Sequence, residues 1–132
     1  MDGLSVAASI AGLISLCIDV GKYLNDVKDA PKNAENLRAQ LTTLEHVLQQ
    51  LDTFLRGESV KGKSFDKTSV LCQAMGSCSD QLACVSERLK GAHGNILQRA
   101  KFPFREKEVA KAIESLRGCT QTFQFSLTIE GW

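Results

Sequence analysis

Five cysteines and two histidines are the side chains in this sequence best suited to metal or redox chemistry. Three of the cysteines, Cys72, Cys78 and Cys84, recur six residues apart. In a helix, this spacing points successive side chains roughly 120° apart, so the three thiols cannot meet on one ion. His46 and His93 belong to other segments and lack the spacing of metal ligands. The sequence therefore predicts no metal site.

The cysteines are also expected to stay reduced. Their number is odd, and the N-terminus does not read as a secretion signal, since Asp2 is acidic and no Lys or Arg precedes Lys22. The same pattern predicts a cytoplasmic chain. Because cysteine packs as a small apolar residue, we expect buried or half-buried structural thiols. The full set is Cys17, Cys72, Cys78, Cys84 and Cys119.

No catalytic chemistry is predicted either. The sequence has neither of the glycine-rich patterns that bind nucleotide phosphates, and it has no convincing pair of nucleophile and base. With 16 basic and 15 acidic residues, the net charge of +1 argues against a nucleic-acid binder. We expect no enzyme activity, no cofactor and no small-molecule substrate.

The elements that position these side chains are four predicted helices, at about residues 2–29, 32–56, 66–91 and 103–128. In the last three, apolar side chains recur at alternating steps of four and three residues, which keeps them on one face. The stripes are Leu37, Leu41, Leu44, Leu48, Leu51 and Leu55; Leu71, Met75, Cys78, Leu82, Val85 and Leu89; and Val109, Ile113, Leu116, Thr120, Phe123 and Leu127. Helices joined by short loops pack antiparallel. The sequence predicts one all-α domain over residues 1–132, an antiparallel four-helix bundle.

The end of the last helix has two interpretations. From Phe123 to Ile129, apolar and polar residues alternate, which is the period of a strand. A helix whose last turns are apolar on two faces would show the same alternation, and we favour this helical interpretation.

The first helix differs from the others because Gly3 to Ile18 contain no charge. Those residues span about 24 Å, less than a bilayer core of ~30 Å. Extension to Leu24 reaches about 31 Å but includes Asp19 and Lys22. The segment is therefore either the central helix of the bundle or a helix that is packed at rest and enters lipid on activation. The same apolar surface serves both roles.

Small residues add to this pattern in the first helix. One face of the predicted helix has small residues in its first half and charged residues in its second half: Ser5, Ser9, Gly12, Ser15, Asp19, Lys22, Asp26 and Asp29. The opposite face is apolar: Leu4, Val6, Ile10, Leu13, Ile14, Cys17 and Leu24. Small residues also recur four apart, as Gly3, Ala7 and Ala11 and as Ala8 and Gly12. This spacing permits close helix packing in lipid or in a protein core.

Three segments resemble one protein family. The opening Met1–Leu13 (MDGLSVAASIAGL) resembles the start of fungal HeLo-like N-terminal domains, which head many STAND (NLR-type) signalling proteins. Val27–Lys32 (VKDAPK) is similar to the family's junction between the first two helices, and Phe102–Val109 (FPFREKEV) to its entry into the fourth. Gly3 stands where Pro is common, and Phe102 where Trp is usual. The resemblance covers nearly the whole chain in the right order.

The resemblance implies a helical bundle that executes programmed cell death, including heterokaryon incompatibility, in fungal innate immunity. The family is similar to the HeLo domain and to the four-helix bundle of necroptotic pseudokinases. The resemblance also implies activation by induced oligomerisation, followed by targeting to the plasma membrane and pore-forming damage. Family members usually continue into a NACHT-type nucleotide switch or an amyloid-forming segment, and neither is visible in these residues. The implied partners are an upstream NLR or amyloid signalling protein, further copies of the chain, and membrane lipids.

Carried over to this sequence, the membrane-acting segment is Gly3 to about Val20, held at rest by the other three helices. Its candidate residues are Gly3, Leu4, Val6, Ala7, Ala8, Ile10, Ala11, Gly12, Leu13, Ile14 and Ile18. Six basic residues either favour anionic lipid or form an ordinary solvated surface: Lys61, Lys63, Lys67, Arg99, Lys101 and Arg105. The alternative function is a non-lytic module that oligomerises or recruits partner helices through the same stripes.

Overall fold

A computed structural model describes residues 3–25, 32–56, 70–93 and 105–129 of the chain. It contains four helices, α1 (Gly3–Asn25), α2 (Lys32–Leu55), α3 (Val70–His93) and α4 (Glu106–Ile129). The prediction of an all-α bundle is confirmed. The end of α4 is helical, so the strand alternative is wrong, and the described residues contain no strand. The predicted ends at residues 32, 56 and 91 agree with the observed ends to within two residues, and those at 2, 29, 66 and 103 lie outside the described residues.

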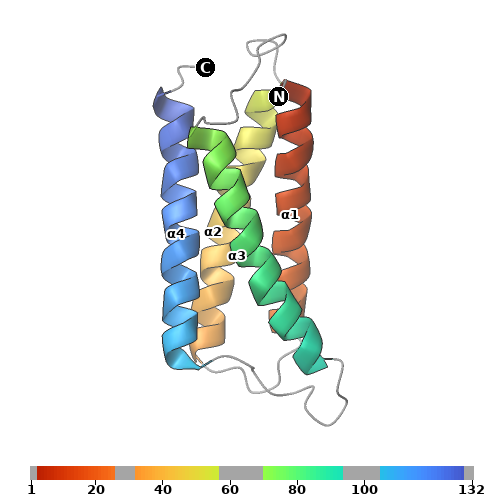
Figure 1. Ribbon diagram of the computed structural model, residues 1–132, viewed down its shortest axis with the longest axis vertical. Helices are drawn as coiled ribbons and strands as arrows, with labels where there is room; N and C mark the ends of the chain where they lie inside the picture. The colour runs from red at the N-terminus through yellow and green to blue at the C-terminus, as the bar shows by residue number, and fades with distance from the viewer. Residues whose placement is uncertain (1–2, 26–31, 57–69, 94–104, 130–132) are drawn as a thin grey trace.

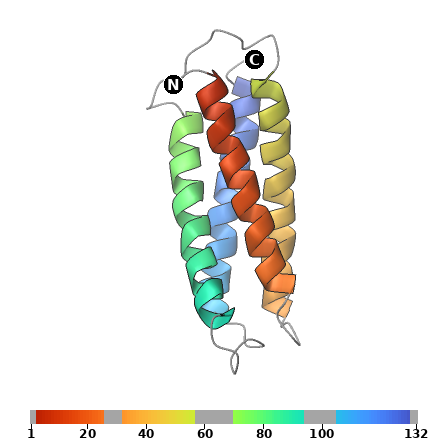
Figure 2. The ribbon, with the colours of Figure 1, turned by 90° about the vertical axis from the view of Figure 1, so that its right-hand side faces the viewer.

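Each helix packs on two others, around a four-sided core. Successive helices run in opposite directions (Figure 1). Helix α1 packs on α2 and α3, and α4 packs on the same two helices, so α1 and α4 lie diagonally opposite. Figure 2 shows this arrangement, with α1 between α3 and α2 and with α4 behind them.

The predicted antiparallel order holds for helices that follow one another in the chain, and the arrangement adds which faces join parallel helices. The α1–α2 and α3–α4 faces are antiparallel as predicted, but the α1–α3 and α2–α4 faces join parallel helices. The prediction rested on short loops, and the segment 57–69 between α2 and α3 is long enough to join helices at diagonal corners.

The predicted stripes form the core. All six positions in α2 and all six in α3 are buried, as are Val109, Leu116 and Phe123 in α4. Ile113 is half-buried, and the side chain of Leu127 lies outside the described residues. Thr120 is buried despite its hydroxyl, because Thr120 Oγ1 donates to the Leu116 carbonyl at 2.8 Å. The spacing of apolar residues therefore predicted the buried face of each of these helices.

The start of α4 is fixed by Glu108. Its Oε1 accepts a hydrogen bond from the backbone N–H of Arg105 at 3.0 Å, one half of a capping box. Glu108 also pairs with Arg88 of α3. The Arg88 guanidinium first, and the Arg105 N–H second, hold the pKa of the Glu108 carboxyl below its ordinary value. Together with Glu106, Glu108 makes the first turn of α4 acidic, which suits the positive end of the helix dipole.

Candidate membrane-acting helix

Helix α1 is the one described helix that is long and apolar enough to cross a membrane, judged by length and composition. The stretch that meets this test is Val6–Asn25, and 33% of it is buried inside the bundle. The remaining positions are exposed or half-exposed although few of them are charged. This combination of an apolar helix and low burial makes α1 the candidate functional element.

One face of α1 is packed in the core. Of the candidate residues, Val6, Ala7, Ile10 and Leu13 are buried, and Ala11 and Ile14 are half-buried. The same face continues through Cys17, Val20 and Leu24. It meets α2 and α3, so α1 occupies a corner of the bundle as each other helix does. The interpretation of α1 as the central helix is wrong.

The other face of α1 is open to solvent. Ala8, Gly12 and Ile18 are exposed, and Ile18 keeps 41% of its surface accessible. The small and charged stripe is also exposed at every position where its side chains are described: Ser9, Gly12, Ser15, Asp19 and Lys22. Gly3 lies in the first turn, and the side chain of Leu4 is outside the described residues. The sequence therefore predicted the two faces of α1 correctly.

The small residues of α1 do not all serve close packing. A Cβ built on Gly12 would meet nothing within 4 Å, so no neighbouring helix approaches there. Ala8 is exposed as well, whereas Ala7 is buried and Ala11 half-buried. Spacing shows that Ala8 and Gly12 share a face, but it does not show that this face is packed. In the resting bundle this pair therefore makes no close helix contact, and its close packing in lipid stays a prediction.

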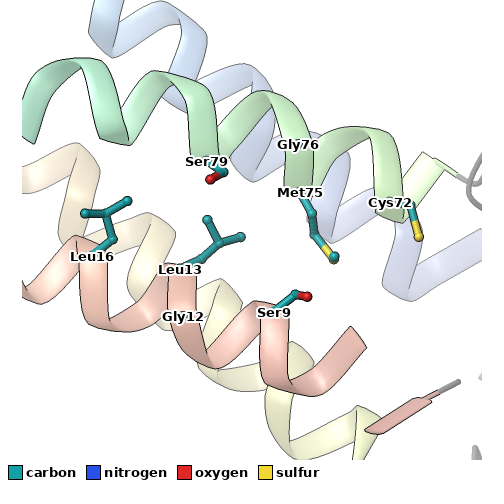
Figure 3. Close-up of a pocket in the computed structure, with 8 residues that line it drawn as sticks. All are labelled: Ser9, Gly12, Leu13, Leu16, Cys72, Met75, Gly76 and Ser79. Carbon is teal, nitrogen blue, oxygen red and sulfur yellow. The ribbon is translucent and has the colours of Figure 1, made fainter. Parts of the chain in front are cut away.

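An open groove of about 550 Å³ runs between the parallel helices α1 and α3. Its apolar lining comes from Leu13, Leu16 and Met75, and the other lining residues have small side chains or none (Figure 3). The complete lining is Ser9, Gly12, Leu13, Leu16, Cys72, Met75, Gly76 and Ser79. No charged residue is among them, and Gly76 also faces open space.

Charge is unevenly distributed along the bundle. The N-terminal parts of α1 and α3 and the C-terminal part of α4 lie at one end (Figure 1). The stretches 3–18, 70–79 and 118–129 at that end contain no charged residue. Phe125, in the last of them, is 55% exposed. On α2 at this end, Asp52 pairs with Arg56 at 3.0 Å. One end of the described bundle is therefore nearly free of charge.

The basic residues predicted to meet lipid are only partly described. Lys61, Lys63, Lys67, Arg99 and Lys101 lie outside the described residues. Arg105 is exposed, but it precedes α4 at the end of the bundle opposite to the start of α1 (Figure 1). The described residues therefore do not bring Arg105 together with the membrane-acting segment.

The cysteines follow the predicted pattern with one exception. Cys17, Cys78 and Cys119 are buried, Cys72 is half-buried, and none of the five cysteines forms a disulfide. Cys84 is exposed, so the prediction of burial is wrong there, because this position lies on the solvent face of α3. Among the described residues, no three His, Cys, Asp or Glu side chains are placed to hold a metal ion.

Sequence reasoning missed a contact between two thiols. Cys78 of α3 donates its S–H to the sulfur of Cys119 on α4, which also accepts a hydrogen bond from Ser77. The Cys78 bond is the largest cause that lowers the pKa of Cys119, to about 7. The same bond, together with burial, raises the pKa of Cys78, and burial raises that of Cys17 to about 12. Cys78 was in the α3 stripe, but Cys119 falls between stripe positions.

The pKa shifts of these thiols predict how the stability of the domain depends on pH. Between about pH 7 and the ordinary thiol pKa of 9.0, the unfolded chain holds a proton that folded Cys119 has released, so the free energy of unfolding should rise with pH. Above pH 9.0 it should fall, because folded Cys17 and Cys78 retain protons that the unfolded chain loses. Urea denaturation under reducing conditions measures both limbs. Cys119→Ala should remove the rising limb, and an unchanged rise would contradict the assignment.

Comparison with known proteins adds no relative. No family model matches the chain, and no curated protein or solved structure matches it either.

Proposed function

We propose that this domain is a membrane-targeting execution module of regulated cell death. Induced oligomerisation releases α1 from the bundle, and the released helices permeabilise the plasma membrane. The observation that carries the proposal is the packing of α1, which has no charged residue over positions 3–18 and is held through one face mainly by α2 and α3. Because α4 contacts both α2 and α3, those three helices keep a shared core after α1 leaves.

The energetics favour an exchange of α1 between protein and lipid. Five large aliphatic side chains of α1 are buried: Val6, Ile10, Leu13, Val20 and Leu24. Their burial stabilises the bundle by roughly 8–15 kcal/mol in total. That is comparable to the whole stability of a typical domain, about 5–15 kcal/mol, so α1 does not leave for water. Lipid replaces the lost contacts, since an apolar helix face can bury itself in a membrane.

The outward face of α1 supports the same exchange. Ala8, Gly12 and Ser15 are exposed at rest and carry no charge, so their transfer into a membrane has little electrostatic cost. The proposal follows the resemblance to HeLo-like domains in placing the resting protein in the cytoplasm. The trigger is an upstream NLR-type or amyloid partner that gathers several copies. Anionic lipid is the favoured target, with the basic residues outside the described ranges as its contacts.

The test is dye release from vesicles that contain phosphatidylserine. The domain is fused to an inducible oligomeriser and compared with a form that lacks residues 1–20. We expect leakage only from the full-length form and only after clustering. If both forms release dye equally, or if clustered full-length protein leaves the vesicles sealed, the proposal is wrong.

A second candidate function is a non-lytic interaction module. The uncharged groove between α1 and α3 favours it, because a partner helix could lie there without meeting a charge. This function predicts stable complexes in solution and no co-flotation with vesicles. Gly76→Asp separates the two functions, since it places a charge in the groove from α3 and leaves α1 unchanged. Loss of self-association without any effect on leakage of clustered protein would assign the groove to protein contacts alone.

A further inference from the structure

A second groove gives access to the thiol pair in the core. It has a volume of about 480 Å³ and lies between α3 and α4, and Ser77, Gly118 and Cys119 are among its lining residues. A Cβ on Gly118 would meet nothing within 4 Å, so the space beside Cys119 is open. Cys119 itself is 7% exposed, whereas Cys78 has no exposed surface. Small solutes can therefore reach Cys119 before they reach Cys78.

The surroundings of Cys119 favour its thiolate. Hydrogen bonds from Cys78 and Ser77 oppose the effect of burial, and the net result is a pKa of about 7. Reactive cysteines combine thiolate character with access from solvent, and redox-sensing ones often have a second thiol beside them. Cys17 offers the contrast within the same core, because burial keeps it protonated. Cys119 and Cys78 thus have the arrangement of an attacking and a resolving cysteine.

We propose that Cys119 is a site of oxidation by hydrogen peroxide and that Cys78 resolves it, forming a disulfide between α3 and α4. The Cys119 thiolate attacks one peroxide oxygen, the O–O bond breaks, and hydroxide leaves as Cys119 becomes a sulfenic acid. The Cys78 sulfur then attacks the Cys119 sulfur and displaces hydroxide. The Cys78 proton neutralises one of the hydroxides, and the other takes a proton from solvent. Two thiol sulfurs lose two electrons, and peroxide is reduced to water.

This disulfide involves neither α1 nor α2. It would covalently join α3 to α4, which are already packed against each other. The proposal therefore does not depend on the membrane function, and a failure of one leaves the other standing.

The experiment treats the folded, reduced protein with a small excess of hydrogen peroxide. Remaining thiols are alkylated, and the protein is digested with trypsin. We expect a mass loss of about 2 Da before alkylation, equal to two hydrogens. The expected cross-linked product joins the peptide Thr68–Arg88 to the peptide Gly118–Trp132. Because the first peptide contains three cysteines, fragmentation must place the bond on Cys78 rather than on Cys72 or Cys84.

Two variants sharpen the result. Cys78→Ser keeps a hydrogen-bond donor beside Cys119 but cannot form a disulfide, so it should leave a Cys119 sulfenic acid that dimedone labels. Cys84→Ser, at the exposed cysteine of the same peptide, should form the disulfide as before. If Cys84 or Cys72 of the native protein is oxidised while Cys119 stays available to alkylation, the proposal is overturned. A disulfide that joins Cys17 to Cys78 would overturn it as well. These two contradicting outcomes are measured on the unmodified chain, so they remain decisive even if a variant fails to fold.

Discussion

Gly12→Asp is expected to lower the rate of dye release by the clustered domain at least about tenfold. In the resting bundle this position is exposed, and a new side chain there meets nothing within 4 Å. The folded state should therefore accept the aspartate, and the circular dichroism spectrum should stay that of a four-helix protein. In the membrane, Gly12 lies near the middle of α1, where a carboxylate enters the apolar region. The substitution thus acts on the inserted state alone.

The size of the effect follows from insertion energetics. An aspartate at the centre of a membrane helix costs about 2.5–3.5 kcal/mol. Since about 1.4 kcal/mol is a tenfold change in an equilibrium, each copy of α1 inserts about 60-fold to 300-fold less often. A pore that needs several copies is affected more strongly than a single helix. The short aspartate side chain also reaches the membrane surface less easily than a lysine would.

The chain contains a matched control for this prediction. Gly118 lies midway along α4, is exposed, and faces open space as Gly12 does. Gly118→Asp should leave dye release unchanged, because in the proposed mechanism α4 stays outside the membrane. Gly12→Ala should also preserve release, since it adds a methyl group and no charge. Equal leakage from Gly12→Asp and the unmodified domain would contradict insertion of α1.

The fold was predictable because each helix carries its own apolar stripe. The spacing from Leu37 to Leu55 identifies the buried face of α2 whatever packs against it. The stripes do not identify the partner helix, so the diagonal placement of α1 and α4 was not predictable from them. Which neighbours are parallel depends on how the segment 57–69 joins two helices, and apolar spacing carries no information about this.

The candidate site was predictable in its faces but not in its contacts. Periodicity separated Val6, Ile10 and Leu13 from the exposed side of α1. It could not tell whether Ala8 and Gly12 pack closely, because small residues suit both a tight interface and an open surface. The Cys78–Cys119 contact depends on the relative height of α3 and α4, which only the three-dimensional structure provides.

Met75→Ala is expected to make the domain release dye at a lower degree of clustering. Met75 is 8% exposed and lines the α1–α3 groove with Leu13 (Figure 3). Truncation of a buried methionine costs at least about 2 kcal/mol, and here the loss falls on the surface that holds α1 at rest. Met75 belongs to α3, so the sequence of the inserting helix is unchanged. A weaker resting state should therefore favour release of α1, by roughly 30-fold for 2 kcal/mol.

Leu116→Ala provides the comparison that separates release of α1 from general unfolding. Leu116 is fully buried on α4, which packs on α2 and α3 and lies diagonally opposite α1. Its truncation should lower the free energy of unfolding by about 2–5 kcal/mol. Amide hydrogen exchange should then accelerate across all four helices, whereas Met75→Ala should accelerate exchange mainly in α1. Only Met75→Ala should lower the clustering needed for leakage. If the two variants shift leakage equally, relative to their loss of stability, the domain reaches the membrane by unfolding as a whole. The proposal that α1 leaves an intact core of α2, α3 and α4 would then be wrong.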